Sequence, residues 1–241
     1  MEAALKLVDD PELSERYTAA VRIVEALLFA AAEPLAETLL QGVIPEGIAV
    51  NDVLRDLQAQ YAGRGVNLLP VAGKWALRTA PDLGYLLASE RQENRKLSRA
   101  SLETLSIVAY HQPVTRAEIE DIRGIATAKG TLDVLMEIGW VRMRGRRKAP
   151  GRPITYGSTE AFLVHFGLDA IADLPGLDEL KATGLLDGRT PKNFAVPLPS
   201  DAPELRGDED ALETDLFDQL AEQRIAETEP ALDAGAAEPA A

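Results

Sequence analysis

The sequence predicts a mainly α chain of the α+β class, made of two units of the same design and a disordered acidic C-terminal tail. An order of three helical patterns, one β-hairpin pattern and one short further helix occurs twice in the 241 residues. Three helices followed by a hairpin form a winged helix, so two tandem winged-helix domains are expected. Beyond residue 188, prolines, acids and alanines dominate. Such a segment buries too little apolar surface to offset the entropy of ordering.

The first unit is expected at residues 18–90, after a flexible N-terminal arm at residues 1–17. Its first helix, from Thr18 to the residue before Pro34, is apolar on most of its circumference and must be covered on more than one side. Two interpretations stay open: the helix lies at the centre of the core, or it forms a homodimer interface. The candidate interface residues are Ile23, Leu27, Leu28 and Phe29.

Residues that end helices and residues that cap them predict the other elements of the first unit. Pro34 ends the first helix because the residue before a proline is pushed out of the α region. Asn51 is expected to cap the third helix, since its side chain can accept hydrogen bonds from the first helical amides. The expected elements are helices at 35–41, 52–61 and 81–89, and strands at 66–71 and 74–79 joined by Ala72 and Gly73.

The second unit, at residues 98–168, follows a linker at residues 91–97 that begins in a wholly polar stretch. Thr115 and Glu118 have the spacing of a capping box, and Gly124 ends the helix that they begin. The expected elements are helices at 101–111, 116–123, 127–138 and 159–166 and strands at 140–144 and 153–156, with Leu102, Leu105, Val108 and Ala109 facing inward. Residues 169–188 form a short C-terminal extension, and the acidic tail covers residues 189–241.

Composition limits the function classes. The chain has no cysteine, which excludes a disulfide scaffold and a thiolate metal site and fits a reducing compartment. The N-terminus carries acids where a signal peptide needs basic residues. The longest apolar run, residues 26–32, is too short to span a bilayer. We therefore expect a cytoplasmic protein.

Charge is distributed unevenly along the chain. Residues 95–168 carry 12 basic and 7 acidic side chains, a balance of +5, whereas residues 169–241 carry 5 and 18, a balance of −13. Residues 1–94 carry 8 and 14, or −6, and the three balances sum to −14. Binding of polyanions by the whole chain is therefore not expected, while binding by the middle segment stays open.

A basic loop between the two strands of the second unit is the candidate nucleic-acid contact. The candidate residues are Arg144, Arg146, Arg147, Lys148 and Arg152. A winged helix reads bases with its third helix, and here that helix is expected to expose Lys129, Asp133 and Glu137. Because two carboxylates repel phosphates, only nonspecific contact by the loop is retained, beside the alternative of a merely solvated loop. Arg152 is also a candidate to pair with a carboxylate such as that of Glu160.

Two long segments of the second unit resemble the family of segregation and condensation protein B. They are LSRASLETLSIVAYHQPVTRAEIEDIRG at 97–124 and GRRKAPGRPITYGSTEAFLVHFGL at 145–168, with weaker support from VEALLFAAAEPL at 24–35. The resemblance implies tandem winged-helix domains and a homodimer formed mainly by the N-terminal domain. It also implies binding to a kleisin, segregation and condensation protein A. Through the kleisin, members join the SMC ATPase on the nucleoid in chromosome condensation and partition, within the cell cycle and cell division.

The kleisin-binding role is assigned to the end of the first helix of the second unit and the turn after it. The candidate residues are Ile107, Tyr110, His111, Gln112, Val114 and Arg116. Tyrosine and arginine are favoured at interface hot spots. The alternative that Ile107 and Tyr110 fill the core stays open.

Catalysis is not expected, and neither is a cofactor. The two histidines, His111 and His165, have no neighbouring ligand pattern, so no zinc site is predicted. No phosphate-binding loop or nucleophile elbow is present in the sequence. The alternative function is a DNA-binding transcription regulator with the same winged-helix fold.

Overall fold

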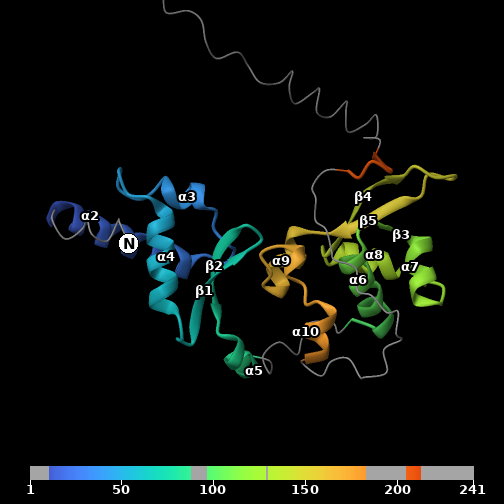
Figure 1. The fold of residues 1–241 in the computed structure, drawn as a ribbon, viewed down its shortest axis with the longest axis horizontal. Helices are drawn as coiled ribbons and strands as arrows, with labels where there is room; N and C mark the ends of the chain where they lie inside the picture. Colours follow the sequence, from blue (N-terminus) through green and yellow to red (C-terminus); the bar gives the residue numbers. More distant parts are fainter. Residues whose placement is uncertain (1–10, 88–96, 129, 183–204, 213–241) are drawn as a thin grey trace, which may run out of the picture.

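A computed structural model describes residues 11–87, 97–128, 130–182 and 205–212, which form a mixed helix and strand structure (Figure 1). Buried apolar side chains form two separate cores, one from residues 20–68 and one from residues 105–171. We call the parts around them the first and the second lobe. The linker expected at 91–97 lies outside the described residues, except for its last residue.

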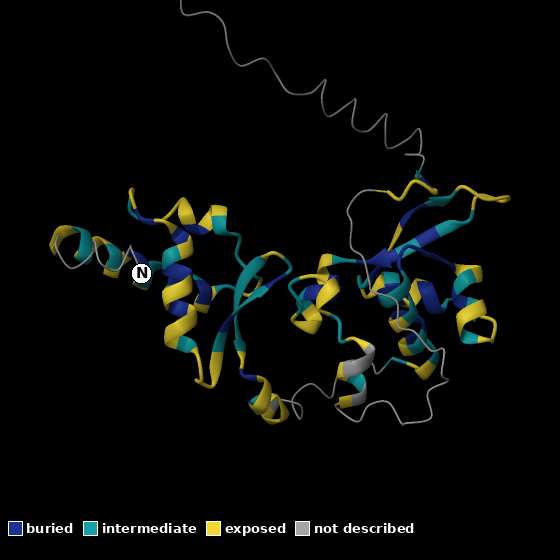
Figure 2. Ribbon diagram, viewed as in Figure 1, coloured by how far each residue is buried: buried dark blue, intermediate teal, exposed yellow. Residues whose placement is uncertain are grey.

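The first lobe packs helices against a two-stranded hairpin. Its elements are α2 (Pro11–Ala30), α3 (Glu37–Gln41), α4 (Val50–Tyr61), β1 (Val66–Val71), β2 (Lys74–Thr79), the 3-10 helix η1 (Pro81–Leu83) and α5 (Gly84–Leu87). The helices α2 and α4 each bury one face in the core and expose the other (Figure 2). Both strands have the predicted bounds, and the turn residues Ala72 and Gly73 have φ of 53° and 70°. Two left-handed residues give the turn a twist that suits a hairpin.

Two boundaries of the first lobe differ from the prediction. The arm expected at 1–17 is wrong from Pro11 onward, because α2 begins there, with a proline at a position that needs no amide donor; residues 1–10 lie outside the described chain. Asn51 does not cap α4, whose N-cap is Ala49. Instead Gln41 of α3 accepts a hydrogen bond from the Val50 amide at 2.9 Å, so a distant side chain satisfies the helix start.

The second lobe places helices against an antiparallel sheet of strand order β3-β5-β4-β6. Thr115 and Glu118 form the predicted capping box, and Gly124 ends the helix with φ of 69°. The elements are α6 (Arg99–His111), β3 (Val114–Thr115), α7 (Arg116–Arg123), α8 (Thr131–Glu137), β4 (Val141–Arg147), β5 (Ile154–Ser158), α9 (Glu160–Phe166), η3 (Ile171–Asp173), α10 (Leu177–Ala182) and β6 (Glu209–Ala211).

Three expectations for the second lobe are wrong. Leu102 is half-exposed and Ser101 is buried, because Ser98 caps α6 and accepts a hydrogen bond from the Ser101 amide at 3.1 Å. The third helix begins at Thr131 rather than at residue 127, since Gly130 precedes it with φ of 100°. The tail expected to be disordered contains β6, so residues 209–211 form a strand.

The two lobes meet where the β1–β2 hairpin lies beside α9 (Figure 1). The Ala72 amide donates to the carbonyl of Leu168 at 2.9 Å. The Gly73 amide donates to the Asp169 carboxylate at 2.7 Å, and Arg78 donates to the carbonyl of Val164 at 3.0 Å. A groove of about 600 Å³ opens beside this junction.

An ion pair also crosses the junction between the lobes. Lys74 of β2 pairs with Glu160 of α9 at 2.5 Å. Glu160, the example named as a carboxylate partner of Arg152, is paired with Lys74. Arg152 lies beside another carboxylate, that of Asp210, at 3.4 Å.

Candidate partner-binding surfaces

The basic wing, which we define as residues 141–158 with strands β4 and β5, does not present all of its cations to solvent. The side chain of Arg144 is only 3% exposed and lies 3.4 Å from the carboxylate of Glu209. A register shift between Met143 and Gly145 marks a β-bulge at Arg144, and a bulge changes the direction of a side chain. Arg144 is thus removed from the candidate nucleic-acid contacts in this structure.

Arg147 contacts three separate segments of the second lobe. Its guanidinium contacts Glu118 of α7 at 2.9 Å, the Pro113 carbonyl at 2.9 Å and Asp208 at 2.8 Å. Burial would raise the pKa of Glu118, but the amide of Thr115 and the charge of Arg147 outweigh it and lower that pKa. Arg147 therefore holds the start of α7 against the wing.

The other wing cations are more exposed. Arg146 donates to the Arg152 carbonyl at 3.1 Å across the loop. The exposed side chains of Lys148 and Arg152 lie 3.6 Å and 3.4 Å from the two carboxylate oxygens of Asp210. The predicted basic loop is therefore real, but acids from residues 205–212 face it.

The residues of this chain that were predicted to bind the kleisin form a buried set and an accessible set. Val114 is buried, and Ile107 packs against the core of the second lobe. Tyr110 is half-buried and donates to the Pro175 carbonyl at 2.9 Å. His111 is half-buried, and burial lowers its pKa, so the ring is neutral at pH 7. Arg116 is exposed and pairs with Glu120 at 3.1 Å.

Gln112 has a structural role in this region. Its side chain is buried, accepts a hydrogen bond from the Ser158 amide at 2.7 Å and donates to the Ser158 hydroxyl at 3.0 Å. A Cβ at Gly157 would lie 2.8 Å from the Gln112 amide oxygen, so only glycine leaves room there. Gln112 therefore fastens the end of α6 to β5 and is not accessible to a partner.

The predicted dimer residues of α2 lie on different faces. Leu28 is buried in the core, and Ile23 and Leu27 pack partly against it. Phe29 is 83% exposed, an unusual position for a large aromatic side chain. The helix therefore serves the core on one face and presents an apolar side chain on another.

The third helix of each lobe carries acids on its exposed face. Asp133 and Glu137 of α8 are exposed, as predicted, whereas Lys129 lies outside the described residues. In α4, Asp56 is exposed and Asp52 pairs with Arg55 at 3.2 Å. Neither helix offers the positive surface that groove binding requires.

Comparison with known proteins decides the family. The family model described as "Segregation and condensation complex subunit ScpB" matches residues 22–177, a range that includes both cores except for Ala20. The chain belongs to the ScpB family. Members of this family are described as subunits of the segregation and condensation complex.

Relatives of known name agree with the assignment. Segregation and condensation protein B of Moorella thermoacetica is 43% identical over 166 residues, 66% of this chain and 84% of the relative. The protein of the same name from Desulforamulus reducens is 38% identical over 165 residues, 67% and 91% of the two chains. The crystal structure of ScpB from Mycobacterium tuberculosis is 29% identical, covers 63% of this chain and 97% of that one, and has a TM-score of 0.29. The ScpB assignment rests on the sequence matches.

Metal ligands and membrane-spanning helices are two further features of the described residues. Among the described residues, no group of three or more histidine, aspartate or glutamate side chains could hold a metal ion. Within the same residues, no helix is long and apolar enough to cross a membrane. Sequence reasoning missed Glu118 as a partner of Arg147. It suggested from charge alone that the acidic tail could inhibit the wing, but it did not identify the acids at 208–210 that contact it.

Proposed function

We propose that this chain is a non-enzymatic homodimeric adaptor. It binds the kleisin subunit of the bacterial SMC complex and supports chromosome condensation and segregation. The observation that carries the proposal is the family match over residues 22–177. Each lobe is assigned to one winged-helix domain, the first from Pro11 to the end of α5 and the second at residues 98–168, because each supplies three helices and a hairpin.

The first lobe is assigned the dimer contact. Phe29 supports this assignment, because a large exposed apolar side chain marks an interaction surface when others surround it. Ala26, one turn before Phe29, and Ala30, the next residue, are also exposed and small, so a second helix could approach closely. Ile23 and Leu27 are half-buried and lie on other sides of α2, because they are six and two residues from Phe29.

The second lobe is assigned the kleisin contact. Of the residues predicted for it, Tyr110, His111 and Arg116 are accessible, while Gln112 and Val114 are buried. The revised contact therefore uses the accessible three. Arg116 lies at the first position of α7, where a partner carboxylate would also meet the helix start.

The alternative of a transcription regulator is disfavoured by charge. The exposed acids of α8 would face phosphates in a major groove. The wing alone contacts backbone rather than bases, and such contacts carry no sequence information. These surfaces therefore suit the binding of a protein better than the binding of DNA.

The test is co-purification with the kleisin from the same genome, followed by light scattering. A stable complex with two copies of this chain is expected. Arg116→Glu should weaken it, while Arg55→Glu, which reverses an exposed arginine on α4, should not. A folded dimer that captures no kleisin would reject the adaptor role.

A further inference from the structure

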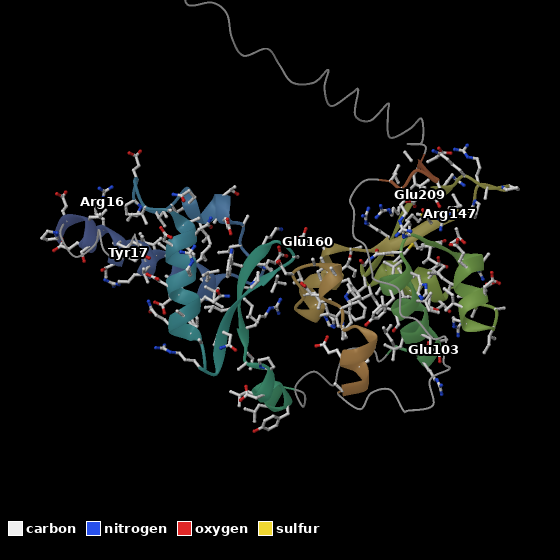
Figure 3. All side chains as sticks on the ribbon, in the orientation of Figure 1. Arg16, Tyr17, Glu103, Arg147, Glu160 and Glu209 are labelled. Atoms are coloured by element: carbon white, nitrogen blue, oxygen red, sulfur yellow. The ribbon has the colours of Figure 1, made fainter. Side chains whose placement is uncertain are left out.

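Residues 205–212 lie along the outer edge of β4, and we call them the acidic latch. We propose that the acidic latch binds the basic wing as an added strand and keeps the wing cations from binding other polyanions, duplex DNA above all. This inference stands apart from kleisin binding, because it rests on contacts inside the second lobe. Figure 1 shows β6 beside β4, and Figure 3 shows Glu209 close to Arg147.

Main-chain pairing gives the latch a defined register. β6 runs antiparallel to β4, with Gly145 opposite Ala211, Arg146 opposite Asp210 and Arg147 opposite Glu209. Just outside this ladder, the Lys148 amide donates to the Asp208 carbonyl at 2.8 Å. An exposed strand edge accepts such a segment because its amides and carbonyls need partners.

Glu209 anchors the latch beneath the surface. Its side chain is fully buried and accepts hydrogen bonds from the Thr155 hydroxyl at 2.6 Å and the Arg206 amide at 3.1 Å. The buried Arg144 lies 3.4 Å from its carboxylate. Because a buried cation and a buried carboxylate compensate each other's charge, a neutral side chain at position 209 would weaken the docking of the latch. The site therefore distinguishes this acid from a generic acidic segment.

Gly145 opens the space that the latch occupies. A Cβ built there would lie 2.6 Å from the Asp210 carbonyl oxygen and 3.0 Å from the Leu205 side chain. Gly145 does not have a positive φ, so alanine suits the backbone of β4 itself. A single methyl group at this position would thus exclude the latch while the wing keeps its own pairing with β5.

The acids on the latch neutralise the exposed part of the wing. Asp208 pairs with Arg147 at 2.8 Å, and Asp210 lies within 3.6 Å of both Lys148 and Arg152. Exposed pairs of this kind add little stability, but they must be broken before the same cations contact phosphate. Because the latch is part of the same chain, it rebinds at a high effective concentration.

The experiment compares Gly145→Ala with Gly176→Ala in the full chain, since a Cβ at Gly176 meets no atom within 4 Å. Binding to a random-sequence DNA duplex is followed by fluorescence anisotropy across a salt series. G145A should release Lys148 and Arg152 from Asp210, while Arg147 stays paired with Glu118. With these two cations free for phosphate, G145A should bind on the order of tenfold more tightly at low salt, with a slope of log K against log salt steeper by about 2. Equal binding by G145A and G176A would overturn the proposal.

A disulfide trap tests the docking itself, and the cysteine-free chain gives a clean background. Arg146→Cys with Asp210→Cys places cysteines at paired positions, whereas Met143→Cys with Asp210→Cys places them about 10 Å apart along the strand, too far for a disulfide. The first pair should cross-link within one chain, and its oxidised form should bind DNA more weakly than its reduced form. No cross-link, or one found only between two chains, would overturn the intramolecular latch.

Discussion

Replacing Phe29 by alanine is expected to weaken self-association and leave folding almost unchanged. The side chain is 83% exposed in the single chain, so little of its apolar surface contributes to the core. Full burial of a phenylalanine contributes about 1.5–3 kcal/mol. A two-fold dimer buries one copy from each protomer, so the loss is about 3–6 kcal/mol and the dimer Kd rises about 10²–10⁴-fold.

Sedimentation over a range of concentrations measures this change in Kd. Leu28→Ala is the matched control, because Leu28 is the next residue of α2 but only 4% exposed. Its truncation is expected to cost about 2–5 kcal/mol of folding free energy in urea titrations. An F29A variant that sediments like the parent at every concentration would refute the interface. If F29A instead loses as much folding free energy as L28A, the Phe29 side of α2 is part of the core.

Further predictions concern the second lobe. Gln112→Leu should lower the unfolding free energy in urea by about 1–3 kcal/mol, because the buried Ser158 amide loses its acceptor; an unchanged midpoint would contradict the role of Gln112. The folded-state pKa of Glu118 is lowered, so its stabilising contribution is present above the unfolded value of about 4.3 and is lost as pH falls through the folded value. Glu118→Gln should therefore destabilise the chain at pH 7 and progressively less as the pH falls below about 4.3, and a loss that does not change with pH would exclude the linkage. Arg146→Glu with Lys148→Glu should leave kleisin co-purification intact, whereas loss of the complex would place the partner on the wing.

Local signals in the sequence predicted local structure well. The hairpin at 66–79 has the predicted strand bounds because two short strand segments and a two-residue turn are encoded within 14 residues. The capping box of Thr115 and Glu118 needs only one turn of helix and is present. Both features depend on neighbours in the chain, which a sequence pattern displays directly.

Features that depend on distant residues were not predicted. Gln41 replaces Asn51 as the group that satisfies the start of α4, and nothing near Asn51 indicates this. The pairing of β6 with β4 joins residues more than 60 positions apart, and an acidic stretch without apolar alternation does not read as a strand. The burial of Arg144 follows from that pairing and from a bulge, so the candidate nucleic-acid contacts included one residue too many.

The junction between the lobes bears on how such chains diverge. Three of its four polar contacts use a main-chain group, at Ala72, Gly73 and the Val164 carbonyl. Every residue other than proline supplies an amide and a carbonyl, so most substitutions at these positions leave the contact atoms in place. An insertion in the two-residue turn would displace them all. Val164 and Leu168, which contribute only main-chain carbonyls, can therefore vary more freely than Arg78 and Asp169, whose side chains make the contact, while the length of the turn stays constrained.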